Sequence, residues 1–190
     1  MNSAIRPLTG LQAARVALVG AVLVTLAASG TALMGRERGA AGDVGSPSWK
    51  RHVELINELV VGGRISLATF TWQDAYSLAL ASREWGSLLE VGDAALAIGD
   101  ASGRRVGWTP KARECYTSAL LRARRQNSLE GVLRTTRALA ALGDRDGTAQ
   151  GLAIAWSLAS DPLSRSRVEE LAKGVEQRGF AQVPVAPGRL

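Results

Sequence analysis

The chain has 190 residues, 46% of them hydrophobic, which allows one domain together with a targeting segment. Its single cysteine, Cys115, excludes an intrachain disulfide, and its single histidine, His52, excludes a histidine-rich metal site. The net charge of +6 is concentrated between Ala101 and Gly143, where nine basic residues accompany only two acidic ones. Few aromatic residues and frequent Leu, Ala, Arg and Glu favour helices over sheet.

The N-terminal part predicts a membrane segment. Residues 1–15 are a short basic terminus, and residues 16–34 contain no charge, which is long enough for a helix to cross a hydrocarbon core of about 30 Å. We therefore expect a transmembrane helix or signal anchor at 16–34. Two alternatives stay open: a secretory signal cleaved near Gly30 or Ala32, and a buried soluble helix.

The basic residues flanking this segment place the N-terminus inside the cell. The domain that follows is then extracytoplasmic (periplasmic), either anchored as a single-pass membrane protein or secreted after signal cleavage. Residues 35–48 are rich in glycine and lack an apolar period, so we expect a flexible linker.

Helical patterns begin at Trp49 and predict a first antiparallel hairpin. Its first helix runs to Gly62–Gly63 after a start at Ser46–Pro47, and its second begins at Thr71. The two are joined by the long connection RISLATF.

A second hairpin is predicted from Trp85 to about Ala123. Its first helix ends at Gly99–Asp100, and an irregular insert, ASGRRVGW, precedes a second helix that starts at Thr109–Pro110. One face of this second helix is apolar, formed by Ala112, Cys115, Tyr116, Ala119, Leu120 and Ala123. Cys115 is expected to be a buried small side chain, and Trp108 an exposed contact or a lid on the hairpin.

The third hairpin spans residues 127–162. Asn127 and Glu130 have the spacing of a capping box, Gly143 ends the first helix, and Asp161–Pro162 ends the second. The apolar face of the second helix is assigned to Ala149, Leu152, Ala153, Trp156 and Ala159.

A last helix at about 164–177, with Val168, Leu171, Ala172 and Val175 on one face, suits a cap over the end of the stack. Residues 179–190 are an extended tail. The glycines Gly62, Gly99 and Gly143 that end the first helices are unequally spaced, unlike those of identical repeats.

Two segments resemble tetratricopeptide repeats. Leu142, Gly143 and Asp144 match the turn, Ala155 and Ala159 the small packing positions, and Ala112, Tyr116 and Ala119 the small–aromatic–small positions of the second helix. This degenerate resemblance covers residues 49–178. It implies an all-α fold, a short right-handed stack of about three antiparallel hairpins with a C-terminal capping helix, and a protein that binds partner proteins without an active site.

Catalytic and cofactor signatures are weak. Asp144–Gly147 lacks the remaining ligands of a calcium loop, and Gly99–Arg105 lacks the lysine and the preceding strand of a phosphate loop, so no metal, cofactor or catalytic residue is assigned. Carboxylate pairs such as Glu90 with Asp93 are read as solvated faces. An enzyme built from Tyr76, Tyr116 and nearby carboxylates is the remaining catalytic alternative.

The arginine-rich middle of the chain is the most informative polar feature. It is either a soluble face or a surface for acidic protein segments or anionic lipid, whereas nucleic acid is disfavoured because no recognised binding module accompanies the charge. We predict a membrane-anchored, non-enzymatic scaffold or assembly factor, or else a released soluble binding module. The predicted partner contacts are Arg104, Arg105, Trp108, Arg122 and Arg125.

Overall fold

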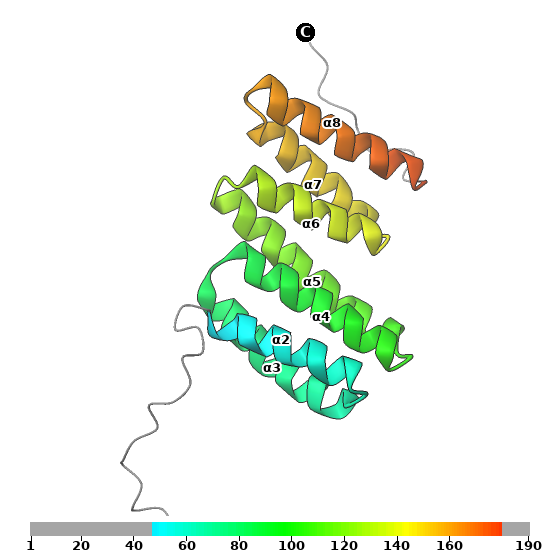
Figure 1. Ribbon diagram of the computed structural model, residues 1–190. Coiled ribbons are helices and arrows are strands. Elements are labelled where there is room, and N and C mark those ends of the chain that lie inside the picture. Colours follow the sequence, from blue (N-terminus) through cyan, green and yellow to red (C-terminus); the bar gives the residue numbers. More distant parts are fainter. Residues whose placement is uncertain (1–46, 180–190) are drawn as a thin grey trace, which may run out of the picture. The chain divides into compact units, whose positions relative to one another are not determined.

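The computed structural model describes residues 47–179, and these form α-helices and no strands (Figure 1). In chain order the helices are α2 (Ser48–Val61), α3 (Ile65–Ser82), α4 (Trp85–Ala101), α5 (Arg105–Arg125), α6 (Leu129–Ala141), α7 (Arg145–Leu158) and α8 (Pro162–Gln177). The predicted all-α class is confirmed. The predicted span at 16–34, the linker up to Ser46 and the tail beyond Gly179 lie outside the described residues. Within 47–179, no helix is both long enough and apolar enough to cross a bilayer.

The helices form three consecutive hairpins, α2–α3, α4–α5 and α6–α7, followed by α8, and they lie in two layers (Figure 1). Layer A consists of α2, α4, α6 and α8, each packed against the next, and layer B consists of α3, α5 and α7. Helix α8 packs on both α6 and α7, so it covers the end of the row. Its buried residues are Val168, Leu171, Ala172 and Val175, as the sequence predicts.

All three hairpins turn in the same way. Gly63, Gly103 and Gly143, spaced 40 residues apart, have φ values of 69°, 65° and 77°, and the next residue donates its N–H to a carbonyl five residues earlier, as in Arg64 to Leu59 (2.8 Å). This is the Schellman arrangement, which needs a left-handed residue after the helix. The expectation of unequal spacing is therefore wrong, because it counted Gly62 and Gly99, and Gly99 lies inside α4.

Two predicted irregular segments are helical. Helix α3 begins at Ile65 rather than Thr71, so the long connection is wrong, and Ala68 is fully buried within it. Helix α5 begins at Arg105, which places Pro110 inside the helix rather than at its start. In both cases burial of apolar side chains near the turn extends the helix past the residues that looked like its boundary.

The third hairpin differs in detail from its prediction. Ser128, not Asn127, caps α6 by accepting the N–H of Gly131 (3.1 Å), while Asn127 adopts a left-handed conformation with φ 51°. Leu152 and Ala159 are buried as predicted, but the other buried residues of α7 are Thr148, Gly151, Ile154 and Ala155, and Ala153 is exposed. The cause is close approach to α6, since a Cβ at Gly151 would lie 2.1 Å from Thr136 Oγ1.

Helices α4 and α5 also approach closely at the centre of the stack. Gly92 faces the ring of Tyr116, and a Cβ at Gly92 would lie 2.4 Å from Cε1 of that ring. The predicted apolar face of α5, from Ala112 to Ala123, is confirmed in full because all six side chains are buried. The thiol of Cys115 is buried and free, and burial raises its pKa to about 12.

Candidate functional site

The residues predicted to contact a partner all lie on or beside α5, but at its two ends. Arg104 immediately precedes the helix, Arg105 and Trp108 are in its first turn, and Arg122 and Arg125 are in its last. With a rise of 1.5 Å per residue, Arg105 and Arg122 are about 25 Å apart along the axis. The structure therefore separates the predicted set into two places.

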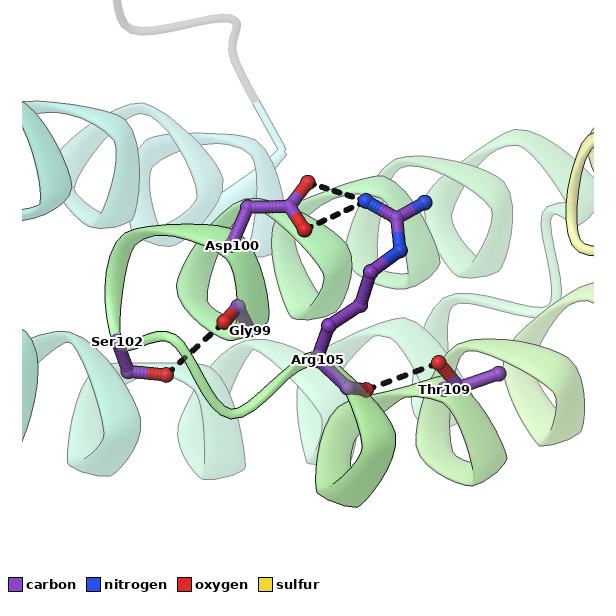
Figure 2. A network of polar contacts seen from close by, with 5 residues as sticks. All are labelled: Gly99, Asp100, Ser102, Arg105 and Thr109. Atoms are coloured by element: carbon purple, nitrogen blue, oxygen red, sulfur yellow. Dashed lines mark hydrogen bonds and ion pairs between the residues drawn. The ribbon is translucent and has the colours of Figure 1, made fainter.

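At the turn end, Arg105 is neutralised within the hairpin (Figure 2). Its Nη1 lies 2.5 Å and 2.6 Å from the two carboxylate oxygens of Asp100. Ser102 Oγ donates to the carbonyl of Gly99 (3.1 Å) at the end of α4, and Thr109 Oγ1 donates to the carbonyl of Arg105 (2.9 Å) at the start of α5. The polar side chains near this turn thus form their hydrogen bonds and ion pair within the α4–α5 hairpin.

Trp108 is buried, so the expected exposed contact is wrong. Its ring meets that of Trp72 edge to face, with centroids 5.4 Å apart, and the Nε1 of Trp72 donates to the carbonyl of Val91 (2.9 Å). The ammonium of Lys111 lies over both rings, at 5.3 Å and 5.5 Å from their centroids. Trp108 is a core residue that joins α5 to α3 and α4.

At the other end of α5, Arg122 reaches across to the C-terminus of α3. Its Nη1 donates to the carbonyl of Ala79 (2.9 Å) and its Nη2 to that of Leu80 (2.9 Å). These carbonyls belong to the last turn of α3, where a cation also favours the helix dipole. Arg122 is therefore a cap for α3 as well as a candidate contact.

A cavity of about 330 Å³ opens beside Arg122. Arg83, Arg122, Arg125 and Gln126 line it, and Gln126 Nε2 donates to the carbonyl of Arg83 (3.0 Å). Sequence reasoning missed Arg83 and Gln126. Gln126 is the C-cap of α5, one turn after Arg122, whereas Arg83 reaches Arg122 only through the packing of α5 against the α3–α4 connection.

Layer A carries a second group of charged residues that the sequence did not reveal. Glu90 on α4 is half-buried, and desolvation raises its pKa, opposed by the nearby Lys50 and Arg134. Desolvation also raises the pKa of Asp93, while a hydrogen bond from the hydroxyl of Tyr116 (2.6 Å) opposes the rise. Glu90 is thus partly buried, contrary to the expectation, whereas Asp93 is an exposed residue, as expected from the sequence.

The next helix of layer A, α6, carries two arginines, Arg134 and Arg137. The guanidinium of Arg134 lies 5.5 Å from the ring centroid of Trp85, linking α6 to the start of α4. A cavity of about 140 Å³ lies between α6 and α8, with Arg137, Glu170 and Arg178 around an apolar floor of Ala140, Leu171 and Val175. The signal that could have revealed this group is the arrangement of Arg134 and Arg137 at helical spacing on α6.

The two tyrosines of the catalytic alternative each donate to a carboxylate, Tyr76 to Glu114 (2.9 Å) and Tyr116 to Asp93. Burial, followed by the carboxylate, raises the pKa of Tyr76 to about 12 and that of Tyr116 still further. Both hydroxyls therefore stay protonated at neutral pH, and neither tyrosine lines either cavity described above. Their geometry is that of structural hydrogen bonds.

In the described part of the chain, no three His, Cys, Asp or Glu side chains gather closely enough to hold a metal ion. Asp144 illustrates why, since it caps α7 by accepting the N–H of Gly147 (3.0 Å) and forms an ion pair with Arg113 at 2.9 Å. Comparison with family models, curated proteins and solved structures finds no match for this chain.

Proposed function

We propose that the chain is a membrane-anchored helical-repeat scaffold or assembly factor that binds other proteins of a membrane or envelope complex and catalyses no reaction. The sequence basis is the tetratricopeptide-like pattern of residues 49–178 and the uncharged segment at 16–34, which would anchor the domain on the extracytoplasmic side. The three successive hairpins with a closing helix are consistent with this proposal.

The observation that carries the proposal is the order of charges along layer A. Two carboxylates, Glu90 and Asp93, lie on α4, and the cavity between α6 and α8 is lined by Arg137 and Arg178 together with one carboxylate, Glu170. A protein segment lying across α4, α6 and α8 would meet the two carboxylates first and then a cavity whose two arginines outnumber its one carboxylate. Such a sequence of charges fixes the direction in which a partner segment binds.

The arginines predicted as partner contacts lie at the two ends of α5, which belongs to layer B. Arg104 and Arg125 are exposed, while Arg105 and Arg122 are engaged by Asp100 and by the α3 carbonyls. Any partner contact at the two ends of α5 therefore involves two surfaces rather than one. Acidic protein segments or lipid head groups are the partners that suit them.

Site-specific photocrosslinking in native membranes tests the proposal. A photoreactive residue at Arg137 on layer A should capture a defined partner protein, identified by mass spectrometry, whereas the same residue at Gln73, exposed on layer B, should not. Charge reversal with Arg134→Glu should abolish the crosslink from position 137. Equal capture from both positions, or no specific product from position 137, would reject binding through layer A.

A further inference from the structure

The cavity beside Arg122 has an unusual lining. Its four residues, Arg83, Arg122, Arg125 and Gln126, all carry N–H donors, and none carries a carboxylate. The ion pairs found among residues 47–179 join Arg105 to Asp100, Arg113 to Asp144 and Arg167 to Glu130, so none of them neutralises an arginine of the cavity. Three guanidiniums thus share one space of about 330 Å³ without an acidic partner.

The last turn of α5 does not need these arginines to satisfy its own carbonyls. The backbone N–H groups of Gln126, Asn127 and Ser128 already donate to the carbonyls of Arg122, Arg124 and Ala123, at 2.9–3.0 Å. Arg122 uses both of its terminal nitrogens on α3, yet its Nε and one remaining N–H stay available, because a guanidinium has five donors. The frame of the cavity is fixed while donors remain free.

Arg83 adds a second, independent observation. Its backbone is left-handed, with φ 61°, a conformation that residues with a long side chain rarely adopt. At the corresponding junction between the second and third hairpins, Asn127 takes this conformation with φ 51°, and asparagine does so readily. Asn or Gly would adopt this turn at a lower conformational cost than Arg. The turn geometry therefore does not explain why an arginine occupies position 83.

We propose that Arg83, Arg122, Arg125 and Gln126 form a binding site for a phosphate group. A phosphate bears up to two negative charges and several acceptor oxygens. A group of guanidiniums therefore binds a phosphate better than it binds a single carboxylate. Arg122 is held in place by the carbonyls of α3, and Arg83 and Arg125 supply the other two guanidinium groups of the cavity. The phosphate belongs either to a small soluble compound or to a lipid head group. The site shares Arg122 and Arg125 with the second surface of the proposed function, but its test measures phosphate binding, whereas crosslinking from position 137 tests the proposed function.

Isothermal titration calorimetry on the full chain in neutral detergent, at about 50 mM salt where surface charges are weakly screened, tests the site. The probes are inorganic pyrophosphate, a short-chain phosphatidic acid below its micelle concentration, and triglutamate. The test variant is Arg83→Gln with Arg125→Gln, which leaves the α3 cap at Arg122 intact. The matched control, Arg51→Gln with Arg104→Gln, removes the same charge from two exposed arginines elsewhere.

We expect saturable binding of at least one phosphate probe, weakened at least about tenfold in the test variant and less than about threefold in the control. Binding of pyrophosphate identifies a soluble phosphate as sufficient, and binding of phosphatidic acid alone identifies the lipid head group. Circular dichroism confirms that the variants are folded. The site is rejected if neither phosphate probe binds, if triglutamate binds as tightly, or if both double variants weaken binding equally.

Discussion

The two ends of α5 carry similar residues that have different roles. At the turn end, Arg105 is paired with Asp100 and Trp108 is buried against Trp72, so this end builds the hairpin. At the other end, Arg122 caps a neighbouring helix and Arg125 faces a cavity without an acidic partner. The role of each arginine therefore depends on which carboxylates or carbonyls of other helices lie within hydrogen-bond distance, and the sequence alone does not show these.

The largest effect should come from the turn end. Replacing Trp108 by Ala removes a buried aromatic side chain that joins three helices, which should lower the free energy of unfolding by about 3–5 kcal/mol. Chemical denaturation of the full chain measures this loss. The neighbouring Arg104→Ala, at an exposed position, should change stability by less than about 0.5 kcal/mol. A loss below about 1 kcal/mol for Trp108→Ala would show that this end is not part of the core.

The centre of α5 should be nearly as sensitive. A Cβ at Gly92 would lie 2.4 Å from the Tyr116 ring, which cannot withdraw easily because its hydroxyl is bonded to Asp93. Gly92→Ala should therefore lower the free energy of unfolding by about 2 kcal/mol despite the better helix propensity of Ala. Gly107→Ala, where a Cβ meets nothing within 4 Å, is the matched control and should be neutral or stabilising. Equal behaviour of the two variants would contradict close packing at Gly92.

These contrasts show what sequence alone could predict. The apolar faces of α5 and α8 follow from a regular spacing of three and four residues, and burial agrees with the pattern. The start of α5 could not be found, because Thr109–Pro110 has the local chemistry of a helix start while Trp108 extends the helix through contacts with α3. The face of α7 was predicted only in part, at Leu152 and Ala159, since Gly151, which has no side chain to mark a face, packs closely against α6.

The candidate sites were less predictable than the fold. Arg122 and Arg125 could be named from local charge density, but Arg83 lies 39 positions before Arg122 in a connection without a pattern. Its left-handed backbone belongs to the end of α3, and its place in the cavity arises from the packing of α5 on the α3–α4 junction. Likewise, the partial burial of Glu90 could not be predicted, because it depends on the helices packed beside α4.

A smaller effect is expected at the capping arginine. Arg122→Gln removes the arginine donor to the carbonyl of Leu80 and one of the donors to the carbonyl of Ala79, which also accepts from Ser82 and Ser87. This should cost about 1–2 kcal/mol of stability. Arg105→Gln breaks only an exposed ion pair and should cost less than about 1 kcal/mol, a loss that high salt reduces further. Thermal unfolding at low and high salt compares the two. If the two variants lose the same amount, or if salt removes the effect of Arg122→Gln, the cap assigned to Arg122 is wrong.

The smallest effect is a pH dependence at the centre of α5. Burial raises the pKa of Cys115 from 9.0 to about 12, so the folded chain keeps the thiol protonated at a pH where the unfolded chain loses that proton. The contribution of the thiol to stability is complete below pH 9 and is lost as the pH rises toward 12, because the unfolded state binds fewer protons. At pH 10 the loss should be about 1 kcal/mol.

Tyr76 and Tyr116 add losses of the same sign, so Cys115→Ala is compared with the unchanged chain at pH 8 and pH 10. The stability difference between the two chains should shift by about 1 kcal/mol in favour of the variant, and parallel pH profiles would mean that the thiol is accessible to water.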